Sequence, residues 1–324
     1  MRRYFFICLS FLILSTFIAI RPASADYKQA VAYYSQGDFN RAIQSLKPDI
    51  DKSPDWEFGQ RLMGLSYLNI NNNALAVTHL SRAAELRSTA FSTYFGLGQA
   101  YFNMRRYNDA ITALNRADQL AAGEENPSAE RARVHIVRGT AHYRTNNFSG
   151  AVNDLREAVR SNPSDWTLFL MQGVSYLNLN SVNEAIQALE RAIALQPGEA
   201  AIRDVLGRAY LRRGTRELSE KRYRDATQTL LMAKTYDSNN GYINYNLAEA
   251  YLFEQRYADA EKELTAAADR LPDNAGVFTR LGLVYERQNK HELALGAYRK
   301  AYELNPSQEL RETVDRVSGN IRRK

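Results

Sequence analysis

Tyrosine recurs along this chain of 324 residues at a nearly fixed interval, with histidine at one of the eight positions. The series is Tyr33, Tyr67, Tyr101, His142, Tyr176, Tyr210, Tyr251 and Tyr285. The intervals are 34 residues, except for two of 41. A small residue precedes each member by three positions, at Ala30, Gly64, Gly98, Gly139, Gly173, Gly207, Ala248 and Gly282. So regular a repeat predicts a stack of similar units rather than one globular core.

An alanine, followed four residues later by a leucine, completes most repeats. The alanine comes nine residues after the tyrosine position, at Ala42, Ala76, Ala110, Ala151, Ala185, Ala260 and Ala294, and Ala226 is displaced by seven. The leucines are Leu46, Leu80, Leu114, Leu155, Leu189, Leu230 and Leu264. Small residues allow two helices to cross closely, and the larger side chains fill the space between them. Proline and glycine are sparse, at 8 and 17 residues, so the expected class is all-α.

This pattern resembles the tetratricopeptide repeat, a helix–turn–helix unit of 34 residues. Departures are Ala30 and Ala248 for glycine, His142 for tyrosine, Asp49 for an alanine that closes the other units and Tyr298 for leucine. The resemblance implies a right-handed α-solenoid of about eight units with a C-terminal capping helix. The expected units are residues 26–56, 57–90, 91–131, 132–165, 166–199, 200–240, 241–274 and 275–306.

Residues 307–324 are expected to form the capping helix and a basic tail. Ser307 can cap a helix that carries Leu310, Val314 and Val317 on one face and ends near Gly319. Two intervals of 41 residues interrupt the repeat. We expect a longer loop around 121–131, and a first helix lengthened by two turns in the unit of Tyr210.

Residues 1–25 have the pattern of an export signal. A basic start is followed by the uncharged apolar run 4–20 and by the small residues of 23–25. Cleavage predicts a chain that starts at Asp26 and contains no cysteine, since Cys8 is the only one. It also lowers the formal net charge from +6 to +3. We expect an exported, periplasmic protein; the alternative is an uncleaved membrane anchor.

No pattern for catalysis, a cofactor or a metal stands out, so an enzyme is not expected. Glycine-rich phosphate loops, nucleophile elbows and paired cysteines are missing from the sequence. The four histidines are His79, His135, His142 and His291. His135 and His142 lie two turns apart at positions where other units place packing residues, so we interpret them as core residues.

The resemblance implies that the first helix of each unit lines a concave groove. In units two to five the expected groove residues are Arg61, Leu65, Leu68, Asn69, Phe95, Gln99, Phe102, Asn103, Ile136, Thr140, Tyr143, Arg144, Leu170, Val174, Leu177 and Asn178. This set is apolar and aromatic, with asparagine on one edge. It favours a protein or peptide partner that is buried in the groove and hydrogen-bonded by asparagine. Some of these side chains can instead pack between adjacent helices.

The sixth unit carries a basic run with the candidate patch Arg203, Arg208, Arg212, Arg213 and Arg216. A solvated helix face is the simplest interpretation. The functional alternative is a site for an anionic polysaccharide or another acidic partner in an export or assembly complex. Nucleic acid is not an expected partner of an exported protein. The sequence therefore favours a scaffold in the cell envelope, with polymer binding as the alternative.

Cleavage can be tested by the N-terminal sequence of the purified protein. We expect it to begin at Asp26, because the apolar run and the small residues before it form a processing site. Mass spectrometry of the intact chain checks the same point. A chain that retains residues 4–20 would support the membrane anchor instead.

Overall fold

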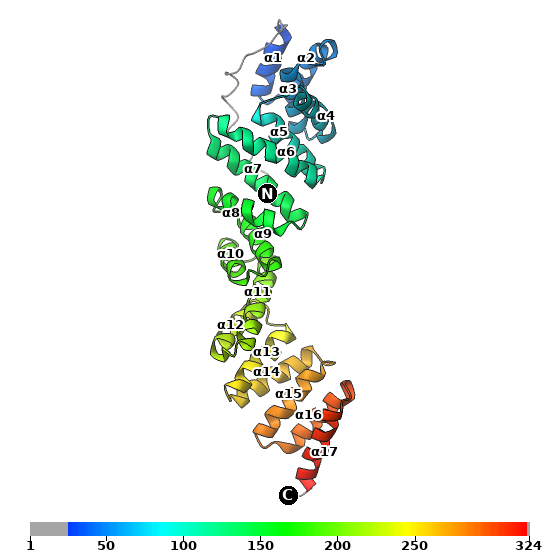
Figure 1. Ribbon diagram of the computed structural model, residues 1–324, viewed down its shortest axis with the longest axis vertical. Helices are drawn as coiled ribbons and strands as arrows, with labels where there is room; N and C mark the ends of the chain where they lie inside the picture. Colours follow the sequence, from blue (N-terminus) through cyan, green and yellow to red (C-terminus); the bar gives the residue numbers. More distant parts are fainter. Residues whose placement is uncertain (1–24, 323–324) are drawn as a thin grey trace. The chain divides into compact units, whose positions relative to one another are not determined.

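The computed structural model describes residues 25–322, which form seventeen α-helices, one short 3-10 helix and no strand. The predicted export segment lies outside the described residues, apart from Ala25. The chain divides into two compact units, of residues 1–171 and 172–324. Each is described by itself. Along both units the helices follow one another as antiparallel pairs joined by tight turns (Figure 1).

The first unit contains α1 (Ala25–Ser35), α2 (Phe39–Lys52), α3 (Glu57–Asn69), α4 (Asn73–Glu85), α5 (Phe91–Asn103), α6 (Tyr107–Leu120), the 3-10 helix η1 (Ala121–Gly123), α7 (Pro127–Arg144), α8 (Phe148–Ser161) and the start of α9 (Trp166–Asn178). The second unit continues with α10 (Val182–Leu195), α11 (Ala200–Ser219), α12 (Tyr223–Tyr236), α13 (Gly241–Phe253), α14 (Tyr257–Arg270), α15 (Ala275–Arg287), α16 (His291–Leu304) and α17 (Gln308–Arg322).

Each helix pair closes on the contact of a small residue with a large side chain, which in five of the eight pairs are a glycine and a leucine. The leucine comes sixteen residues after the small residue of the first helix, as in Gly64 and Leu80. A Cβ added to Gly64 would lie 2.6 Å from the Leu80 Cγ, and the same distance is 2.5 Å for Gly98 and Leu114. Leu80 and Leu114 are fully buried. Glycine is needed at these positions because a side chain would prevent the two helices from approaching so closely. Its freedom to adopt unusual backbone angles is not the reason.

In the sixth pair the crossing glycine is Gly214, not Gly207 as the tyrosine series predicts. A Cβ on Gly214 would lie 2.6 Å from the Leu230 Cγ, whereas one on Gly207 would meet the Cβ of Asp237 at 3.0 Å. With Gly214 as reference, Ala226 is in its regular place twelve residues later. The tyrosine position of this pair is then Glu217, and Tyr210 lies two turns earlier on the same helix.

The turns inside the pairs support this register. Seven residues after each crossing residue the backbone has a positive φ, at Gly37, Asn71, Arg105, Asn146, Asn180, Lys221, Gln255 and Asn289. This left-handed residue ends the first helix and reverses the chain. Lys221 comes seven residues after Gly214 and has a φ of 61°. The contact and the turn thus agree on where the sixth repeat begins.

Both seven-residue insertions lie before the crossing motif and lengthen the first helix. Helix α11 has 20 residues, compared with 13 in α13, which confirms the lengthened helix. Helix α7 has 18 residues and begins at Pro127, so the longer loop expected around 121–131 is wrong. Only a short bend follows η1 before Asn126 caps α7 through the backbone N–H of Ala129. The expected boundary at residues 131 and 132 therefore falls inside a helix.

First helices form the inner layer of the first unit. Helix α1 contacts α3, α3 contacts α5, and α5 contacts α7. Within the described part of this unit, successive second helices have at most marginal contact. A stack in which one layer of helices is closer together than the other curves toward the closer layer. The first helices therefore line the concave side of this unit.

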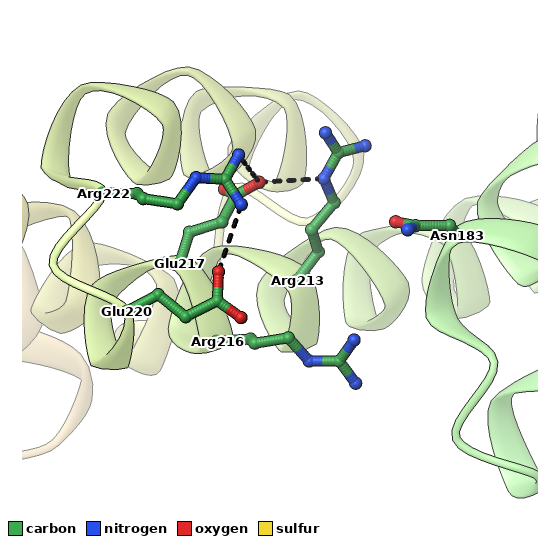
Figure 2. Close-up of a pocket in the computed structure, with 6 residues that line it drawn as sticks. All are labelled: Asn183, Arg213, Arg216, Glu217, Glu220 and Arg222. Carbon is green, nitrogen blue, oxygen red and sulfur yellow. Dashed lines mark hydrogen bonds and ion pairs between the residues drawn. The ribbon is translucent and has the colours of Figure 1, made fainter.

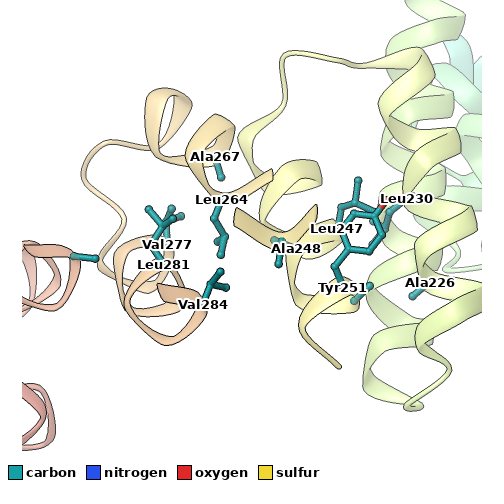
Figure 3. Close-up of a cluster of buried hydrophobic side chains, with 13 residues drawn as sticks. Ala226, Leu230, Leu247, Ala248, Tyr251, Leu264, Ala267, Val277, Leu281 and Val284 are labelled. Atoms are coloured by element: carbon teal, nitrogen blue, oxygen red, sulfur yellow. The ribbon is translucent and has the colours of Figure 1, made fainter. Parts of the chain in front are cut away.

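The core is a chain of small clusters between neighbouring helices. Figure 3 shows one in the second unit, with Leu230 of α12 and Leu247 of α13 at one end and Leu264 of α14 and Val277 of α15 at the other. All four are fully buried. Because each cluster joins only consecutive helices, burial is local in sequence, as expected of a repeat fold.

Helix α17 covers the last pair. Its Val317 is 1% exposed and packs with Leu310 and Val314 against α16. Ser307 Oγ accepts a hydrogen bond from the Leu310 N–H at 3.2 Å, which confirms the predicted cap. The helix does not end near Gly319 but continues to Arg322. The reason is that Ile321 also packs against this cluster, so apolar contact continues the helix past the glycine.

The register can be tested with Gly214→Ala and a control, Gly296→Ala. A Cβ at Gly214 overpacks the buried Leu230, so the free energy of unfolding should fall by about 1–3 kcal/mol. A Cβ at Gly296 meets nothing within 4 Å. Because alanine has the higher helix propensity, Gly296→Ala should raise the free energy of unfolding by up to about 1 kcal/mol. Urea denaturation followed by circular dichroism measures both. Equal effects of the two substitutions would contradict the crossing at Gly214.

Candidate functional site

Two arginines stacked on aromatic rings lie on the first helices of the first unit. The Arg61 guanidinium lies 5.0 Å from the ring centroid of Phe58, and its Nε donates to Glu57 Oε1 at 3.0 Å. The Arg133 guanidinium lies 4.3 Å from the ring of Phe95, and its Nη1 donates to Glu130 at 2.6 Å. Each cation is thus held by a ring on one side and a carboxylate on the other.

Tyr34 of α1 lies where these groups converge. Burial raises the pKa of its hydroxyl, while a hydrogen bond with Asn69 and the charges of Arg133 and Arg61 act in the opposite direction. The two arginines come from α3 and α7, and both are close enough to Tyr34 to influence its titration. Helices α1, α3 and α7 therefore bring polar and aromatic groups together on the concave side of the first unit. We call Tyr34, Phe58, Arg61, Asn69, Phe95 and Arg133 the arginine–aromatic face.

The predicted apolar groove is more polar at its exposed edge than the sequence suggests. Phe95 is buried, and the half-buried members of the first unit are Arg61, Leu65, Leu68, Gln99, Phe102, Ile136, Thr140, Tyr143 and Leu170. Most of the apolar ones pack against core clusters between adjacent helices. The exposed members are Asn69, Asn103 and Arg144. Val174, Leu177 and Asn178 lie in the second unit, where Asn178 is exposed.

The asparagines of the predicted edge already take part in intramolecular hydrogen bonds. Asn69 Nδ2 donates to the Leu65 carbonyl at 2.8 Å, and Asn178 donates to the Val174 carbonyl at 2.9 Å. Asn103 Nδ2 donates to the side-chain oxygen of Asn73 at 2.9 Å. These contacts fix the orientation of each amide on the helix surface.

Arg133 was not among the predicted groove residues. It lies six residues before Gly139, the position that Phe58 holds before Gly64, and so in the regular part of α7. The sequence prediction took groove residues only from three residues before to five residues after the crossing residue, so it left this position out. The equivalent position of Phe58 was the signal that could have added Arg133 to the groove.

A buried ionic cluster occupies the fourth pair. Arg138 donates to Asp154 through Nε at 2.8 Å and through Nη2 at 2.7 Å, and its Nη1 reaches Asp118 at 3.1 Å. His135 Nδ1 lies 2.8 Å from Asp154 Oδ1. Burial alone would raise the pKa of Asp154, but the hydrogen bonds from Arg138 and His135 lower it below its usual range. The cluster ties α6, α7 and α8 together.

His142 extends this cluster and replaces the repeat tyrosine. Its Nε2 lies 3.9 Å from Asp154 Oδ2, and its ring leaves so little space that a Cβ on Gly150 would lie 2.8 Å from Nδ1. Burial lowers the pKa of His142. The interpretation of His135 and His142 as plain packing residues is therefore incomplete, because both contact a buried carboxylate. The sequence did not reveal this cluster because its contacts join residues twelve to twenty positions apart in different helices.

Most of the predicted basic patch on α11 has intramolecular partners. Arg203 donates to the Thr235 carbonyl at 3.1 Å, and Arg208 lies 3.1 Å from Asp204. Arg212 donates to the Leu177 carbonyl at 2.7 Å, and Arg213 Nε donates to Glu217 at 3.0 Å. The guanidinium of Arg216 has no hydrogen-bond or ion-pair partner within residues 25–322. Arg216 is therefore the member of the patch whose donors are all available in the described chain.

A polar cavity of about 230 Å³ lies at that end, within the second unit. Its lining residues are Asn183, Arg213, Arg216, Glu217, Glu220 and Arg222, which we call the Glu217 pocket (Figure 2). Glu217 is 2% exposed, and its Oε2 has no hydrogen-bond partner within the described chain. Its Oε1 accepts from Arg213 and lies 3.8 Å from Arg222. Sequence reasoning missed Glu217 because it assigned the tyrosine position to Tyr210.

None of the described helices is long and apolar enough to cross a membrane. Within residues 25–322, histidine, cysteine, aspartate and glutamate form no group of three or more that could hold a metal ion.

The paired helices and their crossing contacts define an α-helical repeat solenoid. The sequence profile of the tetratricopeptide repeat matches residues 61–127, 136–200 and 245–309, and another profile of this repeat matches residues 24–47. These segments make up more than half of the 324 residues. The chain belongs to the tetratricopeptide repeat family.

Similar proteins share this repeat at low identity. Anaphase-promoting complex subunit 3 of Schizosaccharomyces pombe is 22% identical over 269 residues, 79% of this chain and 38% of that protein. The Hsp70-Hsp90 organizing protein of Triticum aestivum is 20% identical over 65% of this chain and 35% of its own length. The peroxisomal targeting signal receptor of Kluyveromyces lactis is 25% identical, with shares of 59% and 32%. The chain spans about a third of the length of these relatives.

One similar solved structure is that of MamA from Desulfovibrio magneticus RS-1. It covers 55% of this chain and 97% of its own, with 20% identity and a TM-score of 0.40.

The buried ionic cluster should contribute far more to stability than an exposed ion pair. Arg138→Met leaves the carboxylate of Asp154, which is 7% exposed, without its main partner. We expect the free energy of unfolding to fall by about 3–5 kcal/mol. The control is Arg160→Met, which breaks the exposed pair with Glu157 and should cost less than about 1 kcal/mol. Urea denaturation measures both losses. Similar losses would contradict the role of the cluster.

His142 should make the first unit sensitive to mild acid. Its pKa is lowered in the folded chain, so the unfolded chain binds more protons below the ordinary histidine pKa of about 6.5. The contribution of His142 to the free energy of unfolding is therefore fully present above that pH. It is lost as the pH falls toward the pKa of His142 in the folded chain, by up to about 1.4 kcal/mol per pH unit. His142→Gln should remove this part of the slope in urea denaturation between pH 7 and 5. An unchanged slope would show that His142 does not titrate differently on folding.

Proposed function

We propose that this protein is a non-enzymatic scaffold that binds a segment of another protein on the concave side of its first unit. The observation that carries the proposal is the arginine–aromatic face, where Arg61 and Arg133 are stacked on Phe58 and Phe95. The tetratricopeptide repeat matches and the names of the relatives support a role in protein assembly or recognition.

The chemistry of this face suits protein recognition. Arginine and aromatic residues are enriched at the centres of protein interfaces, where they contribute much of the binding energy. Glu57 and Glu130 hold the two guanidinium groups by hydrogen bonds, so less rotational freedom is lost on binding. The outer nitrogens of Arg61 remain available for a carboxylate or carbonyl group of the partner.

We further propose that the scaffold acts in a bacterial cell envelope, on the periplasmic side. Support comes from the export pattern of residues 1–25 and from a chain without cysteine after Cys8. An uncleaved segment at residues 4–20 would place the same scaffold on the membrane surface.

A second candidate function is the binding of an anionic polymer by the second unit. The observation that favours it is Arg216, a cation without an intramolecular partner in the described residues, at the edge of the Glu217 pocket. Of the other arginines, Arg208 is paired with Asp204, whereas Arg203 and Arg212 donate to backbone carbonyls and keep their charge.

The first candidate can be tested by charge reversal on the arginine–aromatic face. Arg133→Glu places a carboxylate over Phe95 and beside Glu130, so affinity for the partner should fall at least about tenfold. The matched control is Arg116→Glu on the second helix α6, which is exposed and lies 5.8 Å from the ring of Tyr94.

Affinity capture from envelope extracts with the wild type identifies the partner, and titration of both variants measures the change in its Kd. Retention of full affinity in Arg133→Glu, or an equal loss in Arg116→Glu, would rule out this face as the binding surface.

A further inference from the structure

The Glu217 pocket presents unused hydrogen-bond donors on one side. Arg213 uses its Nε for Glu217, and no partner of its two terminal nitrogens is found within residues 172–322. The whole Arg216 guanidinium is likewise available. Figure 2 shows both groups on the side of Glu217 that faces Asn183. Two guanidinium forks and one amide therefore border the same small cavity, which is a suitable environment for a carboxylate.

The other side of the pocket presents acceptors. Arg222 donates to Glu220 Oε2 at 3.1 Å and to Asp225 at 2.8 Å, so its charge is already balanced. Glu217 Oε2 is buried, so a ligand in the pocket does not reach it. The carboxylate of Glu220 is exposed at the pocket. A ligand with hydroxyl groups can donate to it, whereas a ligand with only acceptor oxygens is repelled there.

We propose that the Glu217 pocket binds one uronic acid residue of an acidic polysaccharide. Its carboxylate accepts hydrogen bonds from Arg213 and Arg216, and its ring hydroxyls donate to Glu220. The proposal rests on the second candidate function and specifies its ligand chemistry.

Three properties favour a sugar acid over other anions. All six lining residues are polar, as a ligand covered with hydroxyl groups requires. The cavity of about 230 Å³ is smaller than the pockets of ~300–1,000 Å³ that hold drug-sized ligands, so it suits a single sugar ring. Sulfate and phosphate dianions and the side chains of aspartate and glutamate bring acceptors alone, and the Glu220 carboxylate at the pocket repels them.

The test compares trigalacturonate with an acetylated, amidated tri-glutamate peptide, which carries the same three negative charges. Isothermal titration calorimetry at one ionic strength gives the Kd of each. The variants Arg216→Gln and Asn183→Asp change exposed residues, so the fold is retained, as circular dichroism verifies. The control Arg208→Gln removes the same charge from α11 at an arginine that is paired with Asp204.

We expect trigalacturonate to bind more tightly than tri-glutamate. Arg216→Gln and Asn183→Asp should each raise its Kd at least about tenfold, because one loses a charge-assisted donor and the other adds a repelling carboxylate. Arg208→Gln should leave the Kd unchanged.

Three results would overturn the proposal. Equal binding of tri-glutamate would indicate an acidic protein segment as the ligand. An equal loss in Arg208→Gln would indicate general charge attraction. Salt-sensitive binding of dextran sulfate without binding of trigalacturonate would leave the second candidate function in place and refute the uronate site alone.

Discussion

The contact of a small residue on each first helix with a large side chain sixteen residues later holds the repeat together. At Gly64, Gly98 and Gly214 a single added carbon would collide with a buried leucine. The two helices of a pair can approach this closely only because the crossing residue has little or no side chain. The contact sets the position of the turn, and the turn sets where the second helix begins. All later packing between pairs depends on this register.

The two lengthened helices show what the register permits. In α7 and α11 the extra turns come before the crossing, so they leave the contact with Leu155 and Leu230 intact. In both pairs an ionisable residue takes the place of the repeat tyrosine. His142 joins the cluster around Asp154, and Glu217 forms the wall of a pocket. The polar features of this protein therefore occur where the repeat departs from its regular length and composition.

The two binding proposals concern different helices. Arg133 lies over Phe95 in the regular part of α7, which supplies a cation to the concave side of the first unit. In the added part of α11, Arg203 donates to the Thr235 carbonyl at the end of α12. Arg216, whose guanidinium has no partner in the described residues, lies beside the Glu217 pocket. The proposals for a protein partner and for a sugar acid therefore concern separate surfaces, each within one unit.

The sequence by itself determined the helical repeat, the family resemblance, the capping helix at Ser307 and the lengthened first helix of the sixth pair. It could do so because crossing residues, turns and caps act over a few residues and recur in every unit. Only the tertiary structure decided that Gly214 is the crossing residue, that α7 begins at Pro127, and that Asp154 gathers Arg138, His135 and His142. It also decided which arginines are paired and which apolar side chains pack between helices. These properties depend on side chains of different helices, whose distances a periodic pattern does not contain.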